Sequence, residues 1–139
     1  MEQKRTVRII FGIVVVVVIY ILQQVFFKTP SFDKVMMETA SEINKNCPIM
    51  VDQETRLDNV IALPNNVYQY NYTLINRIKD SLNVEDIQNY FEPKILNNVK
   101  TDPALEIFRK NKKTMAFHYR DKNGEFILNI SITPEKYNQ

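Results

Sequence analysis

The chain has 139 residues, and an uncharged stretch near its start takes up nineteen of them, which leaves residues 28–139 for a folded domain. That length is enough for one small domain with one core and too short for two. Apolar residues make up 45% of the chain and charged residues 24%, which is typical of globular proteins and excludes disorder throughout. With two glycines, one histidine and one cysteine, the sequence excludes glycine-rich phosphate loops, zinc sites of His and Cys alone, and an internal disulfide.

The net charge of +2 comes from the first 27 residues, which contain three basic residues and one acidic residue. The rest of the chain has 15 basic and 15 acidic residues. Because a neutral domain lacks the basic surface that nucleic-acid binding requires, we expect no nucleic-acid partner. The basic run at residues 109–113 is typical of a solvated helix end, where cations favour the negative pole of the helix.

Residues 9–27 carry no charge, and fifteen of them are Ile, Leu, Val or Phe. As a helix this segment would be about 28 Å long, close to the thickness of the hydrocarbon core of a bilayer. The sequence therefore predicts a cytoplasmic stub at residues 1–8, a transmembrane helix at residues 9–27 and an extracytoplasmic domain at residues 28–139. Basic residues precede the helix, so the positive-inside rule predicts a single-pass inner-membrane protein with its N-terminus in the cytoplasm and its domain in the periplasm. The alternative is a cleaved signal peptide and a free periplasmic protein, although no small-residue cleavage site follows.

The first half of the domain is predicted to contain a helix and a β-hairpin. A helical repeat of apolar residues predicts a helix at residues 31–47, with these residues on its core face: Phe32, Val35, Met36, Ala40 and Ile43. Residues 55–63 and 67–75 flank a Pro-Asn-Asn turn signal and predict a hairpin, although the apolar pattern of the first strand is imperfect. The second strand alternates regularly, so its tyrosines, Tyr68, Tyr70 and Tyr72, are expected to face the core.

The second half is predicted to contain two helices and a second hairpin. Asn83 is a candidate N-cap for a helix at residues 84–99, in which Pro93 should cause a kink or a break. Asp102-Pro103 begins a short helix that runs to about residue 110. Residues 115–120 and 126–132 alternate on either side of an Asn-Gly turn. One face of the last strand is expected to carry Phe126, Leu128, Ile130 and Ile132.

These elements predict an α+β fold in which an N-terminal transmembrane helix precedes a small domain. The domain has the element order α-β-β-α-(α)-β-β, with an antiparallel sheet that helices cover on one face. The polar residues on the other face are the candidate partner-binding surface: Gln69, Asn71, His118 and Asn129.

The sequence contains no recognisable set of nucleophile, base and oxyanion donors, so we expect a non-enzymatic protein without a catalytic residue, cofactor or metal site. Asp52, Glu54 and Asp58 could offer oxygen ligands to a cation, but their spacing misses the calcium-loop template. The alternative function is a small thiol-dependent enzyme or redox factor that uses Cys47 and His118. Cys47 is expected at the C-terminal end of a helix, where the dipole disfavours a thiolate. In an oxidising compartment, this lone cysteine could instead form an intermolecular disulfide.

Three short motifs carry a resemblance to known proteins: Asn46-Cys47-Pro48-Ile49-Met50-Val51-Asp52, Thr55-Arg56-Leu57-Asp58 and Tyr70-Asn71-Tyr72-Thr73. The pattern resembles a group of small exported or membrane-anchored bacterial proteins, many of them from the Bacteroidetes, over roughly residues 31–132. The resemblance implies a bacterial source and an envelope location, and it supplies no activity or site residue. Asp52 and Thr55 are expected to bond local backbone groups in their loop.

Together these observations predict a single-pass, membrane-anchored envelope protein. Its small periplasmic domain is expected to act as a binding or assembly module. The expected partners are the lipid bilayer and another envelope protein.

Overall fold

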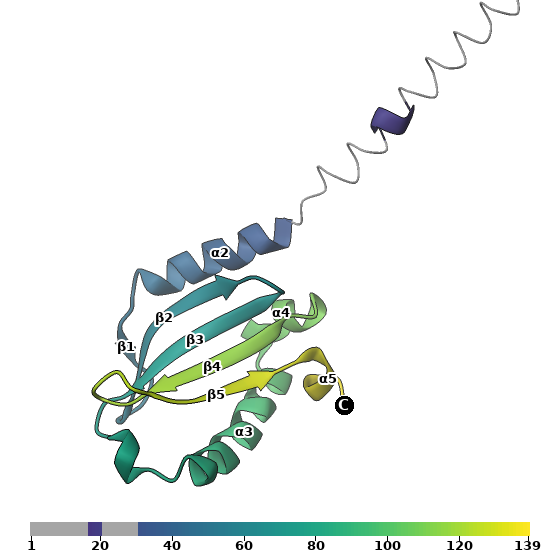
Figure 1. Cartoon of the computed structure of the whole chain (residues 1–139). Coiled ribbons are helices and arrows are strands. Elements are labelled where there is room, and N and C mark those ends of the chain that lie inside the picture. Colours follow the sequence, from purple (N-terminus) through teal and green to yellow (C-terminus); the bar gives the residue numbers. More distant parts are fainter. Residues whose placement is uncertain (1–16, 21–30) are drawn as a thin grey trace, which may run out of the picture. The chain divides into compact units, whose positions relative to one another are not determined.

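The computed structural model describes residues 17–20 and 31–139. In the second range, five strands form one sheet in the order β1-β2-β3-β4-β5 (Figure 1). The strands are β1 (Ile49–Met50), β2 (Thr55–Leu63), β3 (Val67–Leu74), β4 (Thr114–Arg120) and β5 (Phe126–Ile132). Neighbouring strands are antiparallel except β3 and β4, which run parallel.

The mixed sheet corrects the predicted fold class in two respects. The predicted sheet had four strands, and the structure adds β1, which pairs with β2 through only two residues. The predicted sheet was also antiparallel throughout. The two hairpins are present as expected, but the long connection between them returns the chain to the end of the sheet where β3 began. A strand that follows such a crossover runs parallel to the one before it.

The helices are α2 (Ser31–Asn44), α3 (Val84–Thr101), α4 (Glu106–Lys110) and α5 (Pro134–Tyr137), with short 3-10 turns at Lys79–Ser81 and Pro103–Leu105. The carboxamide oxygen of Asn83 caps α3, accepting from the backbone N–H of Glu85 at 3.1 Å. Pro93 lies inside α3, and the helix continues to Thr101, so of the two predicted outcomes, a kink or a break, the break does not occur.

Two β-bulges decide which side chains face the core. In β2 the register shifts between Leu57 and Asn59, so both Leu57 and Val60 are buried although they are three residues apart. This extra residue explains the imperfect pattern of the first strand. In the second hairpin the register shifts after Tyr119, and the predicted core residue Phe126 is 48% exposed instead.

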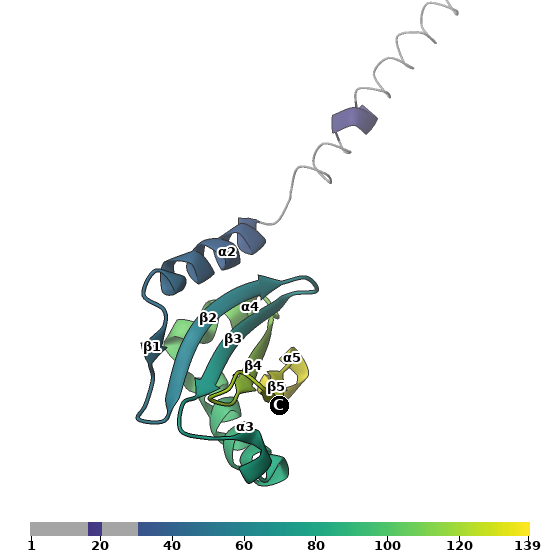
Figure 2. The ribbon, with the colours of Figure 1, turned by 60° about the vertical axis from the view of Figure 1, so that its left-hand side comes forward.

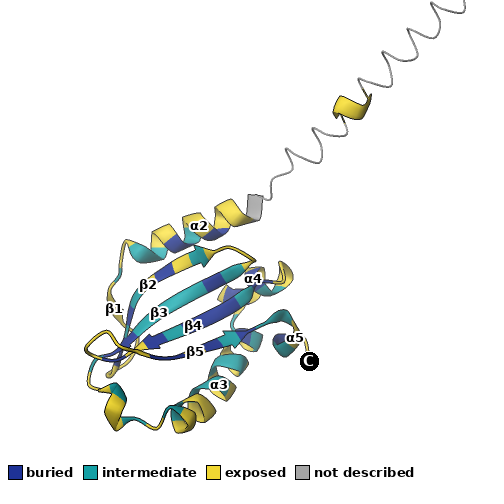
Figure 3. Ribbon diagram, in the orientation of Figure 1, coloured by how far each residue is buried: buried dark blue, intermediate teal, exposed yellow. Residues whose placement is uncertain are grey.

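The helices α3 and α4 lie on one face of the sheet, and no helix of the described residues lies in front of the other face (Figures 1 and 2). Figure 3 shows the buried positions concentrated in the sheet and the exposed ones on the outer sides of the helices. The tyrosines of β3 pack in the core beneath the helices, as predicted. We call the other face, which carries Asn59, Asn71, His118 and Asn129, the open face.

Helix α2 is fastened along the outer edge of β2. Met36 and Ala40 are buried in the core, whereas Val35, predicted to share their face, is 39% exposed. The carboxamide of Asn44 pairs with both backbone groups of Val60: Oδ1 accepts from the N–H at 2.7 Å and Nδ2 donates to the carbonyl at 2.8 Å. Asn44 thus occupies the place of a neighbouring strand.

At the other end of α2, the buried ammonium of Lys113 lies 3.0 Å from the carboxylate of Asp33 and donates to the carboxamide oxygen of Asn66. This contact ties the start of α2 to the β2–β3 turn. The turn itself has positive φ at Asn65 and Asn66, a conformation that asparagine tolerates better than most residues.

The structure also requires a correction to the predicted membrane topology. Within residues 17–20 and 31–139, no helix combines the length and the apolar character needed to cross a bilayer. The predicted span at residues 9–27 falls, apart from residues 17–20, outside the described residues. This finding corrects the predictions of a transmembrane helix and of a single-pass inner-membrane localisation.

Candidate functional site

A groove of about 560 Å³ lies where β2 begins, β3 ends and α3 starts. Its apolar lining comes from β3, the loop after it and the first half of α3: Leu74, Leu82, Ile87 and Phe91. Its polar rim comes mainly from the β1–β2 loop and the loop after β3: Asp52, Glu54 and Arg77. We call this feature the helix-side groove. An apolar hollow with a few placed polar groups is the usual form of a binding site.

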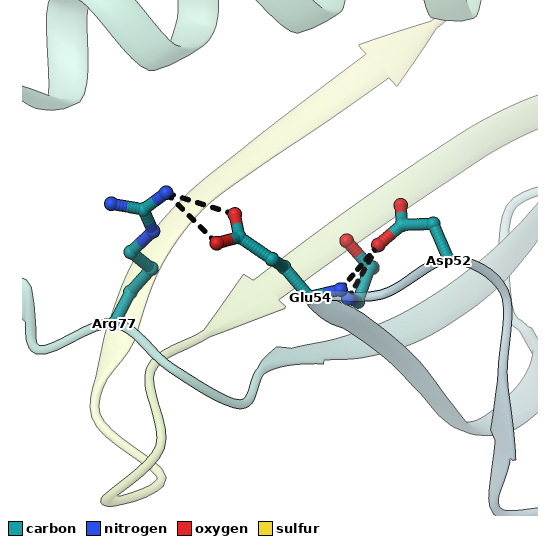
Figure 4. A network of polar contacts seen from close by, with 4 residues as sticks. Asp52, Glu54 and Arg77 are labelled. Atoms are coloured by element: carbon teal, nitrogen blue, oxygen red, sulfur yellow. Dashed lines mark hydrogen bonds and ion pairs between the residues drawn. The ribbon is translucent and has the colours of Figure 1, made fainter.

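An ion pair crosses the rim of the groove (Figure 4). The guanidinium Nη2 of Arg77 lies 2.8 and 3.1 Å from the two carboxylate oxygens of Glu54. Both side chains are about half exposed, so water and salt weaken their attraction. The pair therefore defines the shape and polarity of the rim more than it stabilises the fold.

Asp52 shapes the loop beside this pair. Its Oδ1 accepts from the backbone N–H groups of Glu54 and Thr55, each at 2.7 Å (Figure 4). This confirms the prediction that Asp52 bonds the local backbone. The N–H of Glu54 is the main cause of a lowered pKa for Asp52. The carboxylate thus stays charged at neutral pH and adds a negative charge to the rim.

Aromatic rings form the helix side of the groove. The ring of Phe91 stacks on that of Tyr119 at 5.2 Å, and Tyr119 in turn stacks on Tyr72 at the same distance. Tyr90 is 59% exposed, and the Nζ of Lys94 lies 3.5 Å from its ring centroid. The groove wall therefore continues into the aromatic core, and such rings are enriched at the centres of protein interfaces.

The four predicted partner-binding residues lie elsewhere, on the open face. Asn71 of β3 is paired with His118 of β4, which is paired with Asn129 of β5. Gln69 lies two residues before Asn71 and donates to its Oδ1 at 2.8 Å. The structure therefore brings these residues together on one surface. No ligand tests their function, so their role in binding a partner stays a prediction.

Cys47 and His118 are not placed for joint catalysis. Cys47 lies just before β1 and packs against the core, whereas His118 lies on the open face of β4, three strands away in the sheet. Burial, with the charge of Asp58 as a smaller cause, raises the pKa of the Cys47 thiol. A raised pKa keeps the thiol protonated and unreactive. These observations disfavour the thiol-dependent alternative, while the predicted intermolecular disulfide of Cys47 is untested.

The carboxylates considered as cation ligands are engaged with other groups. Glu54 pairs with Arg77, and Asp58 pairs with Arg56, its Oδ1 lying 2.6 Å from Nε. Among the described residues, no group of three or more His, Cys, Asp or Glu side chains could hold a metal ion.

No pattern in the sequence indicated the helix-side groove. Its lining comes from the β1–β2 loop, the end of β3 and α3, which are separated along the chain. The acidic residues of the rim were noticed, but nothing in the sequence indicates that Arg77 would pair with Glu54. The exposed Tyr90 on an otherwise amphipathic helix was the one local signal available.

Solved structures share this fold at very low sequence identity. A protein from Pseudomonas aeruginosa that is thought to be secreted matches with a TM-score of 0.64 and 8% identity, over 77% of this chain and 93% of its own. The type II secretion pilotin EpsS from Vibrio vulnificus matches with 0.60 and 9%, over 77% and 92%. The pilotin AspS from Vibrio cholerae matches with 0.59 and 9%, over 81% and 97%. These likenesses define the fold class.

Residues 31–128 match a family described as a domain of unknown function, DUF8479. The match covers most of the chain, and the protein belongs to this family. A search of curated proteins finds no significant match.

Proposed function

We propose that this protein is a non-catalytic binding or assembly module of the bacterial envelope, which holds a segment of another envelope protein in the helix-side groove. The observation that carries the proposal is the groove itself, an apolar hollow of about 560 Å³ with a charged rim. The shared fold with two type II secretion pilotins supports an assembly role, because it links this architecture to proteins of a secretion system.

The lining of the groove suits the binding of a polypeptide segment better than it suits catalysis. Its apolar residues can bury one or two side chains of a partner, a gain of roughly 1.5–3 kcal/mol for each large apolar side chain. The rim offers one cation, Arg77, and two carboxylates, Asp52 and Glu54, which can orient the segment through polar contacts. Tyr90 supplies an exposed aromatic ring at the edge, a residue type typical of binding hot spots.

Site-specific photo-crosslinking in the source organism tests this proposal. A photoreactive phenylalanine in place of Tyr90, in the full chain, should capture one recurrent envelope protein. The matched control is the same substitution at Ile107 of α4, which is 49% exposed and lies outside the groove lining. Identical products from both positions, or capture of cytoplasmic proteins alone, would contradict the proposal.

A second variant tests whether the apolar lining holds the partner. Ile87→Ser should lower the yield of the crosslink from position 90, because it replaces part of the apolar lining with a hydroxyl. Ile107→Ser makes the same chemical change outside the groove and should leave the yield unchanged. Circular dichroism of both variants checks that the fold is retained.

A further inference from the structure

A row of uncharged polar side chains crosses four strands of the open face. Asn59 on β2 is paired with Asn71 on β3, Asn71 with His118 on β4, and His118 with Asn129 on β5. We call these four residues the amide row. Asn59 joins it only because the bulge in β2 turns this residue away from the core. Asn59 and Asn129 are exposed, and Asn71 and His118 are half-buried.

Hydrogen bonds hold the amides of the row in fixed orientations. Gln69 Nε2 donates to Asn71 Oδ1 at 2.8 Å, and Asn71 Nδ2 donates to Asn59 Oδ1 at 2.7 Å. Asn129 Nδ2 donates to Ser131 Oγ at 3.0 Å. These bonds leave the amino group of Asn59 and the Oδ1 of Asn129 without a partner among the described residues. The row therefore presents oriented donors and acceptors, whose ordering costs little when a ligand binds.

The four members of the row are themselves uncharged, although the cation Arg120 lies beside His118. The amides carry no charge, and burial, with the charge of Arg120 as a smaller cause, lowers the pKa of His118, so the imidazole is neutral at pH 7. The Nε of Arg120 lies 3.4 Å from the Nε2 of His118 and donates to it, so the other ring nitrogen carries the proton and has no hydrogen-bond partner among the described residues. Asp58, beside the row, is already paired with Arg56.

The spacing of the row separates two kinds of neutral ligand. Neighbouring strands are about 4.8 Å apart, so a chain laid across them meets one polar group at each such interval. An extended polypeptide advances about 3.3 Å per residue, and its side chains on one face repeat at twice that distance, which does not match. One sugar ring of a linear glycan has nearly the length of the strand spacing, so successive sugars can meet successive members of the row.

An exposed aromatic ring lies next to the row. Phe126 is 48% exposed, and its ring centroid is 5.0 Å from that of His118. An apolar ring beside hydrogen-bonding groups suits a sugar, which has an apolar C–H face and a polar edge of hydroxyls.

From the register, the oriented amides and the adjacent aromatic ring, we infer that the open face binds a neutral linear glycan across β2–β5. The side chains of the amide row form hydrogen bonds with the hydroxyls of the glycan, and the ring of Phe126 packs against the face of one sugar. This site is distinct from the helix-side groove, which lies at the opposite face of the sheet.

Titration of the full, 15N-labelled chain with the β-1,4-linked tetramer of N-acetylglucosamine tests the inference. Saturable shifts are expected in the side-chain amide signals of Asn59, Asn71 and Asn129. Asn71→Ala should weaken binding about tenfold, because Asn71 contacts the ligand and orients its neighbours. Asn89→Ala is the matched control, since Asn89 is an exposed amide on α3, and it should bind as the parent chain does.

Three further measurements sharpen the outcome. Phe126→Ser should also weaken binding, and Ile87→Ser, in the groove, should not. The absence of saturable shifts at the row would overturn the inference, as would equal weakening by Asn71→Ala and Asn89→Ala. So would a neutral Asn-Ser hexapeptide that binds the row as tightly as the tetramer, since this result would identify a polypeptide site.

Discussion

Tyr68 and Tyr137 place the same hydroxyl group in two different environments within one core. Both tyrosines are buried. The hydroxyl of Tyr137 donates to the carbonyl of Lys113 at 3.0 Å, whereas that of Tyr68 is buried with no hydrogen-bond partner among the described residues. Burial also raises the pKa of Tyr68 to about 12, so the group stays protonated and uncharged.

We therefore expect Tyr68→Phe to leave the free energy of unfolding unchanged or to raise it by up to about 1 kcal/mol, because a desolvated hydroxyl without a partner is costly. Tyr137→Phe makes the same chemical change at a bonded hydroxyl and should lower the free energy of unfolding by about 1 kcal/mol. Urea denaturation of both variants checks the pair. Equal losses would show that a buried water bonds the Tyr68 hydroxyl.

Asp121 organises the turn between β4 and β5 and is fully buried. Its Oδ1 accepts from the backbone N–H groups of Asn123 and Glu125 at 2.8 and 2.9 Å, and its Oδ2 accepts from that of Lys79 at 3.0 Å. The N–H of Lys79 is the main cause of a lowered pKa for this carboxyl. One carboxylate thus joins the turn to the loop that leads into the groove.

This lowered pKa predicts how stability depends on pH. The carboxyl ionises at about pH 3.9 in the unfolded chain and at a lower pH in the folded one. Its contribution is therefore present above the unfolded pKa and is lost as the pH falls through the folded pKa. Asp121→Asn should have a lower free energy of unfolding than the parent chain at pH 7, because an amide N–H₂ then faces a backbone N–H. The free energy of unfolding of the variant should also fall less steeply than that of the parent chain as the pH is lowered.

Urea denaturation of Asp121→Asn between pH 2 and pH 7 measures this effect. Asp80→Asn is the control, since Asp80 is exposed and its carboxylate accepts no hydrogen bond from the described residues. If both variants lost the same stability at every pH, the role given to the Asp121 carboxylate would be wrong.

The attachment of α2 to the sheet depends on Asn44. Its side chain bonds both the N–H and the carbonyl of Val60, a residue of β2 with which the short strand β1 does not pair. Asn44→Ala should lower the free energy of unfolding by roughly 1–2 kcal/mol, because two backbone groups lose their partner. Hydrogen exchange at the Val60 amide should also become faster.

Asn46→Ala provides the control for this prediction, because Asn46 is exposed two residues later and its side chain makes no hydrogen bond with the described residues. It should leave both the stability and the exchange rate of Val60 unchanged. An equal effect of the two substitutions would mean that the loop, and not the Asn44 carboxamide, holds α2 in place.

At the level of elements, patterns that repeat over a few residues were predictable. Alternation along β3 identified the buried face of the tyrosines and the outward positions of Gln69 and Asn71. The bulges were not predictable from such patterns. One extra residue moves every later side chain of the strand to the opposite face of the sheet from the one that simple alternation predicts. For this reason Phe126 was wrongly placed in the core, and Asn59 was not recognised as a neighbour of Asn71.

For the whole molecule, the sequence identified both hairpins but not their relation. Whether β3 and β4 run parallel depends on the path of residues 75–113, and no local pattern encodes that path. The helix-side groove arises from the same path, which brings α3 next to the start of β2. The strand β1 was not predicted, because two residues are too few to show an alternating pattern. These two residues pair with Arg56 and Leu57 of β2.

The bulge at Asp58 also affects how members of this family should be compared. Before the bulge the odd-numbered positions of β2 are buried, as at Thr55 and Leu57. After the bulge an even-numbered position, Val60, is buried instead. A homologue with one residue fewer here would lose the bulge and regain regular alternation, with the counterparts of Leu57 and Val60 still facing the core and that of Asn59 still facing outward. Equivalent positions in an alignment must therefore be counted from this irregularity, because a gap placed several residues away from it would match inward positions of one chain with outward positions of the other.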